Sequence, residues 1–316
     1  MYFPIAGIEI SIWIPPVVAF VISFFTSMGG VSGAFLLLPF QVSVLGFTSP
    51  SVSTTNQVFN IVAIPGGIYR YIKEGRMVWP LSFIVIIGTL PGVFLGAIIR
   101  IQYLPDPKNF KLFAGLVLLY IGFKLIIDLI KPKDQNDNQT QAEDHFQKIL
   151  KEYKNKDTDP QKKYSKTIIK KFSLINIVYE FYGYTFSINT IGIISLSFIV
   201  GIVGGIYGIG GGAIIAPFLV TFFKLPVYTV AGAALMGTFV TSISSVIFYQ
   251  IIALFYPNMK IIPDWLLGIL FGIGGLLGIY CGARLQKFVP AKIIKWILVI
   301  CIFIPAFEYI FKYFSY

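Results

Sequence analysis

Two glycine clusters interrupt apolar segments of the chain and have the composition to bind a ligand. Residues 29–33 read Gly-Gly-Val-Ser-Gly, and residues 204–212 read Gly-Gly-Ile-Tyr-Gly-Ile-Gly-Gly-Gly. Each glycine destabilises a helix by about 1 kcal/mol relative to alanine, so both clusters favour an unwound turn. A broken helix leaves backbone N–H groups free at the start of the next helix, here at 32–34 and 210–213. These groups, with the positive end of the helix dipole, predict an anion site.

Uncharged polar side chains in segments 50–72 and 226–252 are expected to complete such a site. Membrane helices retain hydroxyls and amides mainly where they face other helices or a cavity. Between Ser11 and Ile68 no side chain is ionised, so an oxyanion suits this field, whereas a cation would find no carboxylate. The predicted substrate-binding residues are Gly29, Gly30, Ser32, Gly33, Thr54, Thr55, Asn56, Gln57, Asn60, Gly208, Gly210, Gly211, Gly212, Thr238, Thr241 and Ser242.

Other glycines recur at every fourth residue and are interpreted differently. This spacing is typical of a small-residue face for close helix packing. We favour packing for these sets, and ligand binding for the two clusters, because packing alone does not need three consecutive glycines. The packing sets are Gly88, Gly92 and Gly96 in the first half and Gly274, Gly278 and Gly282 in the second.

Charged residues near segment ends have simple interpretations. Asp128, Asp264 and Glu308 are expected to be interfacial rather than proton carriers. Arg70 and Arg100 would either attract anions at the mouths of a pathway or anchor helix ends at the membrane surface.

The elements that position these residues must lie in lipid. Of 316 residues, 56% are hydrophobic and 12% are charged, whereas soluble domains carry about 25% charged residues. Apolar runs of roughly 20 residues, the length that crosses a bilayer, recur along the chain. The composition predicts an all-α polytopic protein of the plasma membrane, with the lipid bilayer around it.

Ten apolar segments are predicted from the positions of charges, prolines and glycines. The second segment of each half has only about 14 residues, which is short for a full crossing, and it follows a glycine cluster. We therefore expect broken helices with short half-helices at these two places. The segments are 12–28, 33–46, 50–72, 79–100, 109–131, 188–206, 211–224, 226–252, 263–284 and 291–313.

The two halves of the chain resemble each other. The alignment pairs 30–33 with 208–211, Pro39 with Pro217, Tyr71 with Tyr249 and, after a four-residue insertion, Gly92 and Gly96 with Gly274 and Gly278. Each half has five segments, an odd number, so the second half should enter the membrane in the opposite orientation. We predict two inverted-topology repeats, 1–131 and 187–316, joined by a polar linker, 132–186.

The distribution of positive charge predicts the orientation. Loop 70–78 is net basic and loop 250–262 carries a single cation, as expected of a cytoplasmic and an outside loop. The basic residues of the second half appear one loop later, at 284–295, and the linker has more lysines than acidic residues. The weakly basic loop 100–111 opposes this pattern. Both termini are predicted to lie outside and residues 132–186 in the cytoplasm.

Residues 132–166 are rich in Asp, Asn, Gln and Lys and poor in aliphatic residues. Disorder or a loosely solvated helix is expected there, acting as a plain linker, with regulation or partner binding as the less favoured interpretation.

Several classes of function are excluded. The formal charge of +11 lies between apolar segments, so it does not indicate nucleic acid as a partner. The lone His145, Cys281 and Cys301 form no pattern typical of a metal site or a disulfide framework. No signal peptide is expected, and no residue set indicates a cofactor or an enzyme.

The second cluster and its surroundings resemble a known family. The stretch from Val203 to Pro217, with Gly-Ile-Tyr-Gly-Ile-Gly-Gly-Gly inside it, is similar to the sulfite exporter TauE/SafE family. Leu225-Pro226, Ala231-Gly232 and Thr241-Ser242 fit the same pattern, and 29–33, Pro39 and 53–56 look like its weaker first copy. The resemblance covers 12–131 and 183–314. It implies a multi-pass transporter of small sulfur-containing anions, including sulfite and organosulfonates, usually outward.

We therefore expect a secondary transporter, an exporter of sulfite, an organosulfonate or a related sulfur oxyanion held near the midplane. The first copy has Ser32 where the family's fuller form has a third clustered glycine, so substrate choice could differ. A proton or a sodium ion could serve as the coupling ion. Two alternatives stay open: a passive anion channel on the same scaffold, and a non-transporting membrane subunit that docks a soluble partner through the linker.

Overall fold

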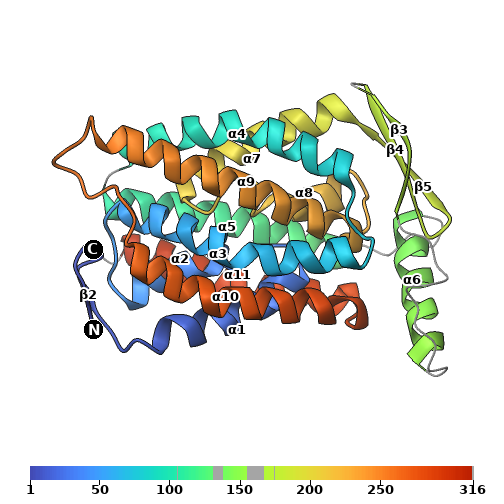
Figure 1. Ribbon diagram of the computed structural model, residues 1–316, viewed down its shortest axis with the longest axis horizontal. Coiled ribbons are helices and arrows are strands. Elements are labelled where there is room, and N and C mark those ends of the chain that lie inside the picture. The colour runs from blue at the N-terminus through green and yellow to red at the C-terminus, as the bar shows by residue number, and fades with distance from the viewer. Residues whose placement is uncertain (105, 131–137, 155–166, 174, 315–316) are drawn as a thin grey trace.

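The computed structural model describes residues 1–104, 106–130, 138–154, 167–173 and 175–314, and most of them form helices that run side by side (Figure 1). The helices of the first half are α1 (Ile14–Met28), α2 (Ala34–Pro39), the π-helical turn η1 (Phe40–Val44), α3 (Ser51–Lys73), α4 (Trp79–Gln102) and α5 (Pro107–Ile130). Those of the second half are α7 (Thr190–Tyr207), α8 (Ile215–Phe222), α9 (Val227–Ala253), α10 (Trp265–Leu285), the 3₁₀ turn η3 (Gln286–Phe288) and α11 (Ala291–Phe314). A helix therefore occupies each of the ten predicted segments.

Within the described residues, five helices are long and apolar enough to cross a membrane, and they belong to α4, α5, α7, α9 and α10 with η3. The apolar helix Ala34–Val44 and the eight-residue α8 are much shorter. At about 1.5 Å per residue they would extend roughly 16 Å and 12 Å, against a hydrocarbon core of about 30 Å. The chain is a multi-pass membrane protein in which the second helix of each half is too short to cross, as the sequence predicted.

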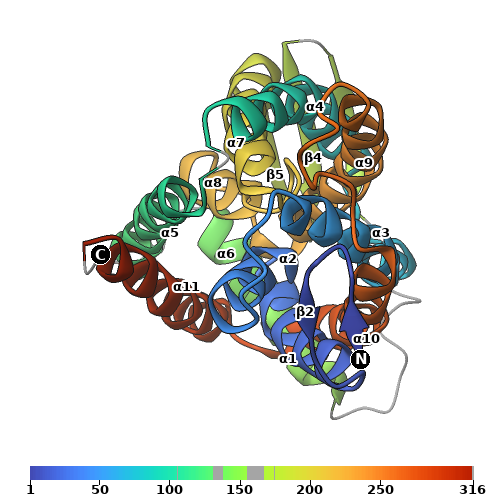
Figure 2. The same cartoon turned by 90° about the vertical axis from the view of Figure 1, so that its left-hand side faces the viewer.

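Six helices form two groups of three (Figure 2). Helix α10 packs along both α1 and α3, and helix α4 packs along both α7 and α9. Contacts between α3 and α9 join the two groups, while α5 and α11 pack against each other at one side. Each group thus contains two helices from one half of the sequence and one helix from the other half.

The glycine spacing explains how α4 and α10 approach their neighbours so closely. A Cβ atom on Gly92 would lie 2.8 Å from the backbone nitrogen of Ile202 in α7. A Cβ atom on Gly274 would lie 2.6 Å from the Cα of Pro16 in α1. These distances leave no room for a side chain, so the packing interpretation is confirmed.

The same contacts correct the sequence alignment of the two halves. Gly88, Gly92 and Gly96 meet α7 in the way that Gly274, Gly278 and Gly282 meet α1. The sequence alignment, with its four-residue insertion, paired Gly274 with Gly92. The contacts pair Gly274 with Gly88 instead, one helical turn earlier. The cause is the loop between α9 and α10, 254–264, which is longer than the loop between α3 and α4, 74–78.

The order of contacting residues gives the direction of each helix. Residues of increasing number in α4 contact residues of increasing number in α7, so these two helices are parallel. The same holds for α10 with α1 and for α10 with α3. Between α3 and α9 the order is reversed, because Gln57 meets Ser242 and Tyr71 meets Gly232. Helices α1, α3 and α10 thus run one way, and α4, α7 and α9 run the other. An inverted repeat requires this arrangement, and the repeat itself stays a prediction.

The two ends of the bundle differ in what lies over them (Figure 1). At the end that we call the sheet end lie α6 (Asn138–Lys154) and an antiparallel sheet in the order β3 (Ile168–Phe172), β4 (Asn176–Phe181), β5 (Tyr184–Asn189). At the opposite end, the hairpin end, a short hairpin of β1 (Tyr2–Phe3) and β2 (Ile8–Glu9) lies beside loop 254–264 and donates a hydrogen bond from Ala6 N to Asp264 Oδ2.

The expected loose linker is only partly what the structure contains. Helix α6 is ordered, and its buried Phe146 packs 4.8 Å from the ring of Tyr228 in α9. Glu143 accepts a hydrogen bond from Val227 N, and Gln139 donates one to Leu225 O. Of the two states expected, disorder or a loosely solvated helix, residues 138–154 form a helix. This helix packs on α9 instead of being loosely solvated, because apolar residues three or four positions apart give it a face to bury. Residues 131–137 and 155–166 lie outside the described part.

The sheet was also missed. Alternate residues of β4, among them Ile177, Tyr179 and Phe181, are buried. Tyr179 shares a hydrogen bond with Thr229 in α9 at 3.1 Å, and burial raises the pKa of its hydroxyl above the ordinary value. The sheet therefore packs against the helices.

Candidate functional site

The first glycine cluster forms a tight break between α1 and α2. Gly30 has a φ of +72°, which favours glycine, and a Cβ atom there would lie 2.7 Å from the Cα of Ala231 in α9. After the turn, the Ser32 hydroxyl accepts a hydrogen bond from Ala34 N at 3.2 Å. The N–H groups of Ser32 and Gly33 have no acceptor among the described residues. The break therefore presents unpartnered donors, as the sequence predicted, although Ala34 N is already satisfied.

The second cluster forms a longer break between α7 and α8. Gly208 ends α7 with a φ of +79°, and Gly210 has a φ of +85°. Gly211 N donates to the Thr241 hydroxyl at 3.2 Å, whereas the N–H groups of Gly210 and Gly212 have no acceptor within the described chain. Helix α8 begins at Ile215 rather than at the predicted 211, because residues 211–214 are still turning.

A single amide joins the two breaks. The Ser32 hydroxyl donates to Asn60 Oδ1 in α3, and Asn60 Nδ2 donates to the carbonyl of Ile209 at 2.9 Å. One turn earlier on α3, Gln57 Oε1 accepts a hydrogen bond from the Ser242 hydroxyl of α9 at 2.6 Å. Both breaks, α3 and α9 thus meet at one place, and Asn60 stands between the breaks.

The polar residues of α3 divide by face. Ser53, Gln57 and Asn60 lie three or four positions apart, so they share the face toward the second break. A Cβ atom on Gly208 would lie 2.7 Å from the Cα of Ser53, and one on Gly210 would lie 3.4 Å from Gln57 Oε1.

The remaining predicted residues of α3 have other neighbours. Thr54 donates to Ile261 O at 2.5 Å, and the Thr55 hydroxyl accepts from Asp264 N at 2.9 Å, so both bond to loop 254–264. Asn56 donates to Ala34 O at 3.0 Å and holds the start of α2. These three residues therefore position backbone near the site rather than face the second break.

The residues that the structure brings together are called the break site below. Three polar atoms at its edge are buried without a partner among the described residues: Ser53 Oγ, Asn56 Oδ1 and Gln57 Nε2. The Ser53 hydroxyl and the Gln57 amide nitrogen can donate, whereas Asn56 Oδ1 can only accept. Donors left unpaired in a membrane interior are costly unless a ligand satisfies them. The break site consists of Gly30, Ser32, Gly33, Ser53, Gln57, Asn60, Gly208, Gly210, Gly211, Gly212, Thr238, Thr241 and Ser242.

The break site is closed in this structure. Its polar side chains are at most 1% exposed, and its glycines are buried. Gly29, which precedes it, is also buried. The break site is therefore not open to either end of the bundle in this structure.

Tyr207 is a residue at the site that the sequence analysis did not select. It is the last residue of α7, and its hydroxyl donates to Phe35 O in α2 at 3.4 Å, so it spans from one break to the other. Its ring is 6.3 Å from that of Phe35. Its place directly before Gly208 was the available signal, but an aromatic beside glycine is more often packing than function.

The predicted role of Arg70 at a mouth is not supported by its contacts. Arg70 forms an ion pair with Glu74, and Glu74 also binds Arg76 at 2.7 Å. Arg76 donates to Gln286 Oε1 at 2.7 Å, and Gln286 Nε2 donates to Met28 O, also at 2.7 Å. This cluster lies at the sheet end and ties the end of α1 to α10 and loop 74–78.

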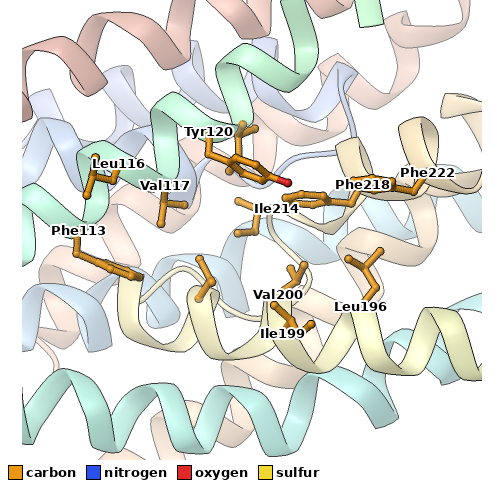
Figure 3. Close-up of a pocket in the computed structure, with 12 residues that line it drawn as sticks. Phe113, Leu116, Val117, Tyr120, Leu196, Ile199, Val200, Ile214, Phe218 and Phe222 are labelled. Carbon is orange, nitrogen blue, oxygen red and sulfur yellow. The ribbon is translucent and has the colours of Figure 1, made fainter. Parts of the chain in front are cut away.

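A cleft of about 570 Å³ opens between α5, α7 and α8 (Figure 3). Its walls are apolar side chains such as Phe113, Val200 and Phe218, and Tyr120 contributes one hydroxyl. An apolar wall cannot satisfy the oxygens of an oxyanion, whereas it suits a lipid chain. Ile214, directly after the second break, forms part of this wall, so the cleft adjoins the segment that carries the second break.

The fold and the site define a membrane transporter: helices that cross the bilayer, two half-helices that do not, and a closed polar site where they begin. Comparison with known proteins gives the family. Residues 16–309 match the family model described as sulfite exporter TauE/SafE, and the chain belongs to that family. It is a family of transporters and not of enzymes.

Similar proteins agree with this family. A probable membrane transporter protein of Bacillus subtilis, YunE, is 22% identical over 293 residues, covering 90% of this chain and 92% of its own. Another, from Xylella fastidiosa, is 22% identical over 259 residues, covering 81% of this chain and 78% of its own. No solved structure matches the chain.

Proposed function

We propose that the protein exports a small sulfur oxyanion, such as sulfite or an organosulfonate, which binds in the break site. The observation that carries the proposal is the set of unpartnered donors there: the N–H groups of Ser32, Gly33, Gly210 and Gly212, with the buried amide of Gln57. No ionised side chain occurs between Ser11 and Ile68, so these donors set the local field. The description of the family supports the choice of sulfite.

Transport on this scaffold requires the two helix groups to move relative to each other. The groups meet where α3 crosses α9, through the hydrogen bond between Ser242 and Gln57 and the link from Asn60 to Ile209. A shift of α4, α7 and α9 against α1, α3 and α10 would open the break site to one face at a time. The ligand would then exchange partners with Gln57 and Asn60 at each step.

The charge distribution supports an orientation for this cycle. We place the termini and loop 254–264 outside, and α6 with β3–β5 in the cytoplasm, because the basic loop 70–78 lies at the sheet end. The break site has no carboxylate, so a coupled proton or sodium ion would bind beside the anion rather than to an acidic side chain.

The proposal is tested with purified protein in proteoliposomes that contain sulfite. Gln57→Leu removes an amide donor, and hydrogen bonds to a charged partner contribute about 1.5–3 kcal/mol, so sulfite should bind about ten- to a hundredfold more weakly. Gly210→Ala should also slow sulfite flux, because φ at 210 is +85° and a Cβ would lie 3.1 Å from Ser242 Oγ.

The matched control is Gly46→Ala, which has a similar φ of +72° but open space around its Cβ. Wild-type flux in both Gln57→Leu and Gly210→Ala would contradict the break site. Current that far exceeds the rate of a carrier, with no dependence on a proton or sodium gradient, would favour a passive channel instead.

A further inference from the structure

Arg100, near the end of α4, is a buried cation that the break site does not use. Its side chain is 0% exposed, and Nε, Nη1 and Nη2 have no hydrogen-bond partner in the described chain. No ion pair with a carboxylate is described for it. An arginine carries five N–H donors in a rigid fork, and burying it unpaired is strongly unfavourable unless something binds it.

The described surroundings of Arg100 supply no hydrogen-bond acceptor for its guanidinium. The ring of Phe110 covers one face, with the guanidinium carbon 3.9 Å from the ring centroid. Tyr249 of α9 is close enough to interact with Arg100 electrostatically, and its buried hydroxyl also lacks a partner within the described residues. Ala97 and Ile101 pack with Tyr249 and close the space with apolar atoms. A positive fork and a hydroxyl donor thus lie together without a counter-charge from the described residues.

The corresponding place at the sheet end is filled differently. Gly96 meets α7 as Gly282 meets α1, and the residues one helical turn further along are Arg100 and Gln286. Gln286 accepts from Tyr71 at 3.0 Å and donates to Met28 O at the end of α1. Tyr71 and Tyr249 occupy matching positions in α3 and α9. The sheet end therefore has a neutral, fully bonded pair where the hairpin end has an unbonded cation and tyrosine.

Arg100 is connected to the break site by aromatic rings. The ring of Phe110 lies 6.2 Å from that of Tyr207, the residue that bridges the two breaks through Phe35. A path from Gly208 to Arg100 would therefore require both Tyr207 and Phe110 to move. This path leads toward the hairpin end, which we place outside.

We propose that Arg100 and Tyr249 form a second anion-binding site, where a small oxyanion such as sulfite is held after it leaves the break site. The fork of the guanidinium binds two oxygens of the anion, and the Tyr249 hydroxyl donates to another. This inference rests on the proposed function for the identity of the ligand, but not for the existence of the site.

The test is isothermal titration of sulfite into the purified full-length protein in a detergent without anionic lipid. The wild type should bind two equivalents. Arg100→Gln, which copies Gln286, should bind one, and so should Gln57→Leu, while Tyr249→Phe should weaken the Arg100 equivalent about tenfold without a change in side-chain volume. Arg284→Gln, an exposed arginine on α10, is the matched control for charge and should keep both.

The outcomes separate the two proposals. The wild type could instead bind a single equivalent of sulfite. If Arg100→Gln removes that equivalent and Gln57→Leu does not, the break site is refuted and the second site is kept. Wild-type binding in both Arg100→Gln and Tyr249→Phe would overturn the second site. Repeating the titration with added phosphatidylglycerol tests the other source of an oxyanion: if this lipid binds the wild type in an Arg100-dependent way and sulfite does not, the site holds a lipid headgroup and the proposal fails.

Discussion

The two ends of the helix bundle bury arginines in opposite ways. At the sheet end, Arg70 and Arg76 share the carboxylate of Glu74, and Arg76 is further bonded to Gln286 and Ala283 O. At the hairpin end, Arg100 has an aromatic ring against one face and no acceptor among the described residues. The helices beneath them pack through the same glycine spacing. Both ends therefore use the same glycine-mediated helix packing, whereas the hydrogen bonds and ion pairs around the buried arginines differ from one end to the other.

This difference has a mechanical meaning. The sheet end is held by hydrogen bonds that meet at Gln286, one of them from the charged Arg76, and they connect α1, α3, loop 74–78 and η3. Opening this end would break all of them together. Between the break site and Arg100 the described contacts are rings and the hydroxyl-to-carbonyl bond of Tyr207, which are individually weak. Elsewhere at the hairpin end, Ala6, Thr54 and Thr55 form hydrogen bonds with loop 254–264. Separating the break site from Arg100 by moving these rings would therefore break fewer charged contacts than opening the cluster around Glu74.

The largest effect is expected when the network at the sheet end loses its anion. Glu74→Ala leaves Arg70, Arg76 and Lys287 without the carboxylate that each of them contacts. Removing one partner of a buried ion pair costs about 3–5 kcal/mol, so the unfolding free energy in detergent should fall by that amount.

Glu180→Ala is the matched control, because Glu180 pairs with a half-exposed lysine, Lys170, on the sheet. Pairs of this kind contribute about 0–1 kcal/mol. Equal losses in the two variants would show that the sheet-end network does not hold that end.

A change of opposite sign is expected at the hairpin end. Arg100→Met replaces an unpaired buried cation with an apolar side chain of similar length, so the unfolding free energy without added anion should rise by about 1–4 kcal/mol. Arg76→Met should lower it, because Glu74 would lose a partner. Thermal unfolding in detergent measures both, and a loss of stability in Arg100→Met would contradict the asymmetry between the ends.

The smallest effect separates the two matching tyrosines. Tyr71→Phe removes a hydroxyl that is bonded to Gln286 and should cost about 1 kcal/mol. Tyr249→Phe removes a hydroxyl that has no partner among the described residues, so its cost should be near zero without anion. Denaturant unfolding of the two variants side by side checks this, and equal costs would remove the distinction.

The sequence predicted the helices well, because composition and length decide which segments enter lipid. Predicted 50–72 and 226–252 became α3 and α9 with ends shifted by a single residue. The glycine breaks were also predictable, since three neighbouring glycines cannot hold a helix against the alternatives.

Properties that depend on which elements meet could not be predicted. The face of α3 toward the second break holds Ser53 and Gln57, whereas Thr54 and Thr55 face loop 254–264, and nothing local in the sequence distinguishes them. The equivalence of Gly88 and Gly274 in the two halves depends on the different lengths of loops 74–78 and 254–264, which the local sequence pattern does not reveal. The docking of Phe146 on Tyr228 joins residues far apart in the chain, so no local pattern announces it.

The packing of α4 on α7 and of α1 on α10 has a consequence for how the protein is made. When a ribosome has delivered only the first five helices, the glycine face of α4 has lipid against it instead of α7, and α1 waits for α10, which comes almost last. Neither half alone can form the close backbone contacts of α4 with α7 or of α1 with α10, because each of these pairs joins the two halves. Assembly in the membrane therefore has to finish as one event, late in synthesis, and a chain cut between the halves would leave two fragments that each complete the other.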